Sequence, residues 1–150
     1  MENKKVLVAD ASEDFRRLFA GALHEEPDMT LVGETGDGEE AVRLVRETAP
    51  DVVVMDMVLA RMDGMEVLRE LSAISPRPQV LVLSGFARGN MAARAAQLGA
   101  DYCMMKPCRT SSVLERIRQL ATQVPMPGEE EERRSSARSL SLESTVTAII

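Results

Sequence analysis

Four polar residues each stand at the end of a short apolar run, and together their side chains suit phosphoryl chemistry. They are Asp10, Asp56, Ser84 and Lys106. Two carboxylates can bind a hard cation such as Mg²⁺. The cation and an ammonium group can neutralise a phosphoryl group that passes to a carboxylate oxygen, and a hydroxyl can donate to its oxygens. Each residue alone is also an ordinary turn residue, so the interpretation depends on their joint placement.

The strongest single pattern is the run of four apolar residues at 52–55, three of them Val, which leads directly into Asp56. An apolar run without polar alternation is typical of a strand buried on both faces. In open parallel sheets, ligands bind at the carboxyl ends of the strands. The pattern therefore predicts that Asp56 is a nucleophile or a ligand.

Apolar runs and helical spacing alternate along the chain. Strands are expected at residues 5–9, 29–35, 51–56, 80–83 and 101–105. Each is followed by apolar residues at helical spacing, with Ser12 as the predicted N-cap of the first helix and Ser112 with Glu115 as a capping box for the last. The segment 29–35 is the least apolar and is expected near a sheet edge. The alternation predicts an α/β fold with a doubly wound, five-stranded parallel sheet.

Composition excludes several classes of function. The net charge of −6 and the 3% aromatic content disfavour non-specific nucleic-acid binding and base stacking. The two cysteines lie five residues apart and the chain has one His, which is no zinc pattern. There is no apolar run of about 18 residues and no apolar signal-peptide segment at the N-terminus. A cytoplasmic protein with reduced thiols is expected.

The character of the chain changes after residue 124. Residues 1–124 form the predicted domain, and residues 125–139 are rich in Glu, Arg, Ser and Pro, as in a flexible linker. Apolar residues at helical spacing then return in 140–150. We interpret this last segment as the first helix of a truncated effector domain.

The combined motifs resemble the receiver domain of two-component response regulators. They are the runs ending at Asp10 and Asp56, Met62-Asp63-Gly64, Leu83-Ser84-Gly85, Leu98-Gly99-Ala100-Asp101-Tyr102 and Lys106-Pro107. The resemblance covers about residues 4–121 and implies a flavodoxin-like receiver fold with strand order 2-1-3-4-5. Within the family, the opening Val8-Ala9-Asp10 and the tail 142–150 look most similar to stage zero sporulation protein A, a phosphorelay regulator of transcription.

The resemblance implies a role for each site residue. Asp56 would accept a phosphoryl group from a phosphohistidine donor, either a kinase or a phosphotransfer protein. Asp10, Asp56 and the backbone carbonyl of Val58 would hold Mg²⁺. Lys106 would pair with the phosphoryl group and Ser84 would bond it. The surface of the fourth helix, fifth strand and fifth helix would then change its partner or homodimer contacts, as a population shift between two states. DNA would be bound only through an effector domain.

Three positions depart from the family pattern. Ala11 stands where a second acid is usual, so Mg²⁺ affinity is expected to be weak. Ala60 replaces a proline and leaves the loop after Asp56 less rigid. Cys103 occupies the position of the switch aromatic, and the neighbouring Tyr102 should face the opposite side of the strand.

Two other interpretations are open. Ala11 and Cys103 favour an atypical pseudo-receiver that acts through protein contacts with weak or no Mg²⁺-dependent phosphorylation. The other interpretation is an enzyme, which the residues disfavour. A haloacid-dehalogenase-like phosphatase would need an acidic residue two positions after the nucleophile, but Val58 occupies that position. A flavin-binding protein would need a phosphate-binding loop after the first strand, but the segment 10–14 there is acidic. The chain is therefore predicted not to be an enzyme.

Overall fold

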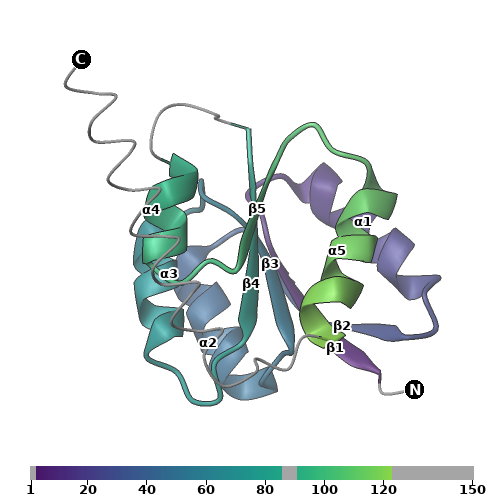
Figure 1. The fold of residues 1–150 in the computed structure, drawn as a ribbon, viewed down its shortest axis with the longest axis horizontal. Helices are drawn as coiled ribbons and strands as arrows, with labels where there is room; N and C mark the ends of the chain where they lie inside the picture. The colour runs from purple at the N-terminus through teal and green to yellow at the C-terminus, as the bar shows by residue number, and fades with distance from the viewer. Residues whose placement is uncertain (1–2, 86–90, 123–150) are drawn as a thin grey trace.

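The computed structural model describes residues 3–85 and 91–122 of the 150-residue chain. Five parallel strands form one sheet in the order β2-β1-β3-β4-β5, as predicted, with a helix after each strand (Figure 1). The elements are β1 (Lys4–Ala9), α1 (Glu13–His24), β2 (Met29–Thr35), α2 (Gly38–Thr48), β3 (Val52–Asp56), α3 (Gly64–Ser72), β4 (Gln79–Ser84), α4 (Met91–Gln97), β5 (Tyr102–Met105) and α5 (Thr110–Thr122). The predicted linker 125–139 and effector segment 140–150 lie outside the described residues.

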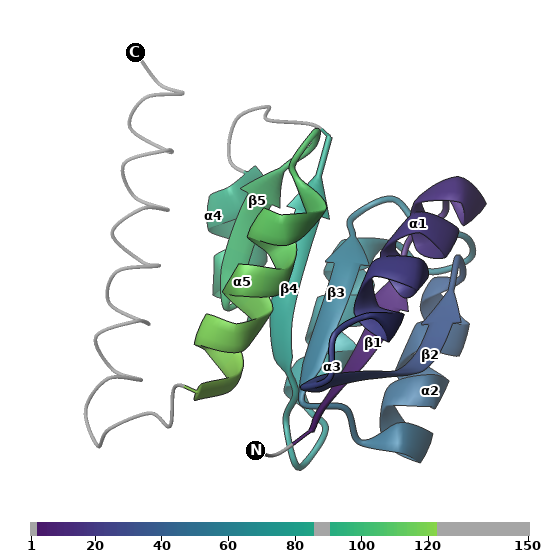
Figure 2. The same ribbon diagram turned by 90° about the vertical axis from the view of Figure 1, so that its right-hand side faces the viewer.

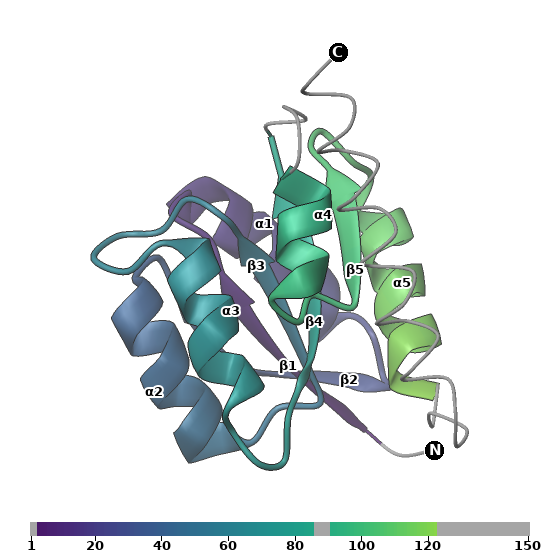
Figure 3. The same cartoon turned by 60° about the vertical axis from the view of Figure 1, so that its left-hand side comes forward.

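The central strands carry continuous apolar runs because helices cover both faces of the sheet. In β3, Val53 and Met55 pack into the core layer with α2 and α3, whereas Val52 and Val54 face the layer with α1 and α5. Figure 2 shows α1 and α5 in front of the sheet, and Figure 3 shows α2, α3 and α4 on the other face. Successive side chains of a strand point to opposite faces, so both sets must be apolar.

The two edge strands are less buried than the central ones. The less apolar β2 is an edge strand, as predicted. At the other edge, β5 exposes the side chains of Tyr102 and Met105. Within the described ranges, no helix is long and apolar enough to cross a membrane.

The predicted caps of the first and last helices had different outcomes. Ser12 is the N-cap of α1, and its hydroxyl oxygen accepts a hydrogen bond from the N–H of Phe15. The capping box at Ser112 was wrong, because α5 begins two residues earlier, at Thr110. The backbone carbonyl of Arg109 accepts from the N–H groups of both Ser112 and Val113, so Ser112 already lies in the first helical turn.

Candidate functional site

The ammonium group of Lys106 bridges the two carboxylates that end β1 and β3. Its Nζ donates to Oδ2 of Asp10 and, at 2.9 Å, to Oδ2 of Asp56. The exposed fractions of the side chains are 4% for Asp10, 16% for Asp56 and 22% for Lys106. The three charges are therefore partly desolvated at one edge of the sheet, where their attraction is stronger than in water.

Strand register brings these residues together. In the parallel pair β1–β3, Ala9 lies opposite Met55, so Asp10 and Asp56 leave the sheet side by side. The N–H of Lys106 donates to the carbonyl of Ser84 at 2.8 Å, which ties the end of β5 to the end of β4. The prediction that Asp10, Asp56 and Lys106 meet at the carboxyl edge of the sheet agrees with these contacts.

Backbone amides orient both carboxylates. Oδ1 of Asp10 accepts from the N–H of Ser12 at 2.8 Å, and Oδ1 of Asp56 accepts from the N–H of Val58 at 3.0 Å. In each carboxylate one oxygen is thus held by the backbone and the other faces Lys106. Each carboxylate oxygen can accept a second hydrogen bond or bind a metal ion, so the site retains free acceptor capacity.

Sequence reasoning missed the part that Phe15 takes in this site. Phe15 fits the apolar helical spacing expected after the first strand, and its ring stacks on Phe19 with ring centroids 5.7 Å apart. Its face also lies under Lys106, with Nζ 4.2 Å from the ring centroid. A cation over an aromatic face is attracted by the ring quadrupole, so Phe15 helps to hold the ammonium group over the carboxylates.

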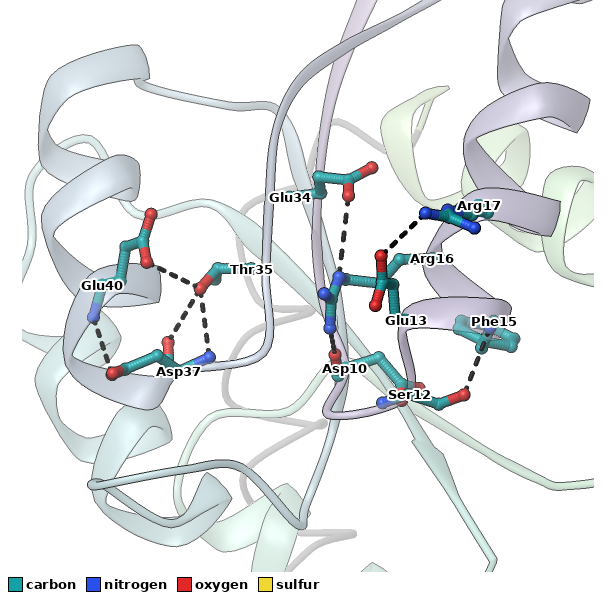
Figure 4. A network of polar contacts seen from close by, with 10 residues as sticks. All are labelled: Asp10, Ser12, Glu13, Phe15, Arg16, Arg17, Glu34, Thr35, Asp37 and Glu40. Atoms are coloured by element: carbon teal, nitrogen blue, oxygen red, sulfur yellow. Dashed lines mark hydrogen bonds and ion pairs between the residues drawn. The ribbon is translucent and has the colours of Figure 1, made fainter.

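Sequence reasoning also assigned no role to Arg16, which Arg17 follows directly in α1. Figure 4 shows its guanidinium turned back toward the end of β1. Nη1 donates to the backbone carbonyl of Asp10 at 2.5 Å, and Nε lies 3.6 Å from Oε1 of Glu34. Arg16 therefore fixes the backbone from which the Asp10 carboxylate projects.

The pKa of Lys106 is raised above its ordinary value. Burial alone would lower this pKa, but hydrogen bonds to Asp10 and Asp56 and the charges of both carboxylates outweigh burial. Lys106 is therefore cationic at neutral pH. Two carboxylates and one ammonium give the cluster a formal charge of −1, so an incoming phosphoryl group would meet repulsion unless a further cation were bound.

A magnesium ion is the cation that this donor set fits best. Asp10, Asp56 and the backbone carbonyl of Val58 would supply oxygen ligands, which Mg²⁺ prefers, and Mg²⁺ often keeps several waters. Ala11 contributes no ligand oxygen and its side chain is exposed. Among residues 3–85 and 91–122, no group of three or more His, Cys, Asp or Glu side chains is placed to hold a metal ion. The residues present would thus offer Mg²⁺ two carboxylates, and the predicted weak affinity stays a prediction.

The other predicted site residues lie close by in different surroundings. Ser84 ends β4 and joins Lys106 through its backbone, and the role of its hydroxyl stays a prediction. Cys103 packs against the layer that includes α4, with Sγ 4.0 Å from the carbonyl oxygen of Ala92. Tyr102 faces the other way, as predicted, and its ring stacks on the Arg116 guanidinium of α5 at 3.8 Å.

Comparisons with known proteins agree with the geometry. Residues 6–118 match the family model of the response regulator receiver domain. A protein-glutamate methylesterase/protein-glutamine glutaminase of Caulobacter vibrioides is 34% identical over 125 residues, which cover 83% of this chain and 36% of that protein. The chain thus spans about a third of the length of this relative.

Solved structures show the same fold. The response regulator domain of Thermotoga maritima CheB superposes with a TM-score of 0.75 at 29% identity, covering 83% of this chain and all of that one. The receiver domain of the response regulator NarL from Mycobacterium tuberculosis gives 0.76 at 26% identity, covering 81% of this chain and 98% of that one.

Proposed function

Since the chain belongs to the response regulator receiver domain family, we propose that it is a phosphoacceptor module in which Asp56 takes a phosphoryl group from a phosphohistidine donor. The observation that carries this proposal is the contact of one ammonium group with both carboxylates. A carboxylate that is held by a backbone amide and faces a cation is oriented for attack on phosphorus.

In the proposed reaction, an oxygen of Asp56 forms a bond to phosphorus as the bond from phosphorus to the histidine nitrogen of the donor breaks. The histidine nitrogen takes the electron pair of the broken bond. Lys106 neutralises the charge on the phosphoryl oxygens, and the Ser84 hydroxyl donates a hydrogen bond to one of them. Asp10, Asp56 and the Val58 carbonyl would hold Mg²⁺, which would supply further positive charge near the transferred group.

The test is the intact mass of the protein after incubation with Mg²⁺ and a small-molecule phosphodonor. The expected result is one added phosphoryl group that is labile to acid, and its absence from the Asp56→Asn variant. The Asp63→Asn variant is the matched control, because Asp63 is an acid on the same loop whose carboxylate caps α3 by accepting from the N–H of Glu66. No adduct on the unaltered protein would refute the proposal.

Ala11 favours a second candidate, an atypical pseudo-receiver that works through protein contacts with little phosphorylation. The Ala11→Asp variant separates the two. If the missing acid limits metal binding, this variant binds Mg²⁺ at least about tenfold more tightly, equivalent to about 1.4 kcal/mol, in a calorimetric titration. Unchanged affinity would mean that position 11 does not face the metal site.

The finer identity is a sporulation-type regulator of transcription, supported by the residues around Asp10 and the tail 142–150. Its receiver face of α4, β5 and α5 would change dimer or partner contacts, and DNA would be bound by an effector domain. The methylesterase relative carries a different effector activity, so the receiver alone does not choose between outputs. We propose that the receiver domain acts in the cytoplasm and is not an enzyme. The second statement is tested by assaying the purified protein for phosphatase turnover and for flavin colour, both of which should be absent.

A further inference from the structure

The loop that follows Asp56, residues 57–63, is held at its midpoint by the turn between β2 and α2. We call these segments the acceptor loop (57–63) and the clamp turn (36–38). The N–H of Ala60 donates to the carbonyl of Gly36 at 3.0 Å, and the N–H of Gly38 donates to the carbonyl of Ala60 at 2.9 Å. Asp37 and Ala60 form an isolated parallel β-bridge. Both backbone polar groups of Ala60 are therefore fixed by the clamp turn.

Asp37 joins the acceptor loop to the start of α2. Its Oδ1 accepts from the N–H groups of Glu39 and Glu40 at 2.8 and 3.2 Å and caps the helix. Its Oδ2 lies 3.0 Å from Nε of Arg61 in the acceptor loop. The N–H of Asp37 in turn donates to the hydroxyl of the buried Thr35 at 3.0 Å (Figure 4). The clamp turn is thus anchored to β2 and α2 before it touches the loop.

Two glycines allow the acceptor loop to pack this closely. A methyl group on Gly38 would lie 2.0 Å from the backbone oxygen of Met62, and one on Gly64 would lie 2.6 Å from Cα of Met57. The N–H of Gly64 also donates to the carbonyl of Met57 at 2.9 Å. The loop is therefore pressed against backbone at both ends, and no side chain could be inserted without displacing it.

The acceptor loop needs such support, because its own sequence supplies little rigidity. It contains no proline, Val58 is 55% exposed, and Arg61 adopts a positive φ of 67°, which is strained for a residue with a side chain. Val58, whose N–H holds Oδ1 of Asp56, is two residues before the clamped Ala60. A shift of Ala60 would therefore pass to the amide that orients the acceptor carboxylate.

Building on the proposed phosphoacceptor function, we infer that the clamp turn fixes the acceptor loop and that Asp37 and Gly38 are positioning residues for phosphoryl transfer to Asp56. They act through Ala60 and Val58 and do not touch the reacting atoms. A displacement of about 1 Å in a reacting group can cost about a hundredfold in rate, so a small movement of this loop is enough to matter.

The sharpest test compares two substitutions of glycine by alanine within helices. Gly38→Ala improves the helix propensity of α2, but its methyl group would clash with the backbone of Met62 and push the acceptor loop away from the clamp turn. The expected result is phosphorylation of Asp56 slowed by about tenfold or more, with faster hydrogen exchange at the Val58 amide. Gly21→Ala in α1 is the control, since a methyl group there meets nothing within 4 Å. It should leave the rate and the Val58 amide unchanged.

A second variant covers the case in which Gly38→Ala does not fold. Asp37→Asn keeps an N-cap side chain of equal quality but removes the charge that attracts Arg61. Because Arg61 is 71% exposed, the loss is modest, and we expect phosphorylation to slow by about two- to fivefold with a changed Val58 amide resonance.

The outcomes separate this inference from the proposed function. Wild-type rates and an unchanged Val58 amide in the folded variants would overturn the inference. A wild-type protein that takes no phosphoryl group would refute the proposed function. Hydrogen exchange at the Val58 amide would then still test whether the clamp turn fixes the acceptor loop: faster exchange in Gly38→Ala supports this, and unchanged exchange rejects it. If Gly38→Ala is unfolded, a changed Val58 amide resonance in Asp37→Asn supports the clamp, and an unchanged one rejects it.

Discussion

Nζ of Lys106 lies 2.9 Å from Oδ2 of Asp56, although the two residues are 50 positions apart in the chain. The adjacent parallel strands β3, β4 and β5 are needed to bring them together, because Asp56 ends β3 and Lys106 follows β5. The contact exists only if these three strands have the correct order and register. It is therefore a demanding test of the predicted topology.

Replacement of Lys106 by Met should remove the ammonium group while keeping much of the apolar volume. Since the cation faces the acceptor carboxylate, we expect phosphorylation of Asp56 to slow by about a hundredfold to a thousandfold, the usual effect of removing one preorganised charge-stabilising donor. The rate of formation of the acid-labile adduct measures this. A rate within a factor of a few of wild type would contradict the role given to Lys106.

The same variant gives a pH prediction with a definite sign. The folded-state pKa of Lys106 is raised above the ordinary 10.5, so its contribution to stability is fully present below that pH and is lost as pH rises through the higher folded value. The difference in unfolding free energy between wild type and Lys106→Met should be constant from neutral pH to about pH 10 and then decline. Urea titrations at several pH values test this, and a decline near neutral pH would contradict it.

The fold could be predicted in detail because its cause is visible in the sequence. Strands covered on both faces must be apolar throughout, and the runs at 6–9, 52–55 and 80–83 are. Parallel topology then requires their carboxyl ends to meet, which brings Asp10 and Asp56 together without further information. The least apolar strand was correctly expected at an edge.

The features that could not be predicted from the sequence are side-chain orientations, which are determined only once the backbone has folded. Phe15 satisfies the helical apolar pattern whether or not a cation lies over its ring. Arg16 turns back to the Asp10 carbonyl, but nothing distinguishes it from the solvated Arg17 beside it. The cap of α5 was misplaced because a Ser in the first turn and a Ser at the cap look alike until the backbone hydrogen bonds are known.

The contact of Phe15 with Lys106 can be measured by a double-mutant cycle. Phe15→Leu keeps an apolar side chain but removes the ring face, and it should destabilise the wild type by about 0.5–1 kcal/mol more than it destabilises Lys106→Met. The stacking of Phe15 on Phe19 is lost in both backgrounds and cancels. Urea unfolding of the four proteins gives the coupling energy, and equal effects in both backgrounds would exclude the cation–π contribution.

Cys103 should be a poorly reactive thiol. Burial raises its pKa above the ordinary value, so less thiolate is present at neutral pH than in an exposed cysteine. In the Cys108→Ser variant, alkylation of Cys103 by iodoacetamide should be slower than alkylation of a small free thiol. If Cys103 lies on the surface that responds to phosphorylation, the phosphodonor should change this rate. Rapid alkylation that the phosphodonor does not affect would contradict both statements.

Arg118 of α5 should stabilise the fold at neutral pH but not in acid. Its guanidinium donates to Asp28 from Nε at 2.8 Å and from Nη2 at 2.9 Å, and to Glu26 at 2.6 Å. The hydrogen bond from Arg118 is the main reason that the pKa of Asp28 is lowered below 3.8. A carboxyl group whose pKa is lower in the folded state than in the unfolded state stabilises the fold at pH values above its unfolded-state pKa. This stabilisation is lost as the pH falls through the folded-state pKa.

The Arg118→Met variant should therefore be less stable than wild type by about 1 kcal/mol at neutral pH, since the pair is partly exposed. This difference should shrink below about pH 4 as Asp28 becomes protonated. Arg17→Met is the control, because Arg17 pairs with Glu13 at the open surface of α1, where both side chains are more than half exposed. Its effect should be less than about 0.5 kcal/mol. If the Arg118→Met difference were as large at pH 3 as at pH 7, the side chain would act through packing of its methylene groups and not through Asp28.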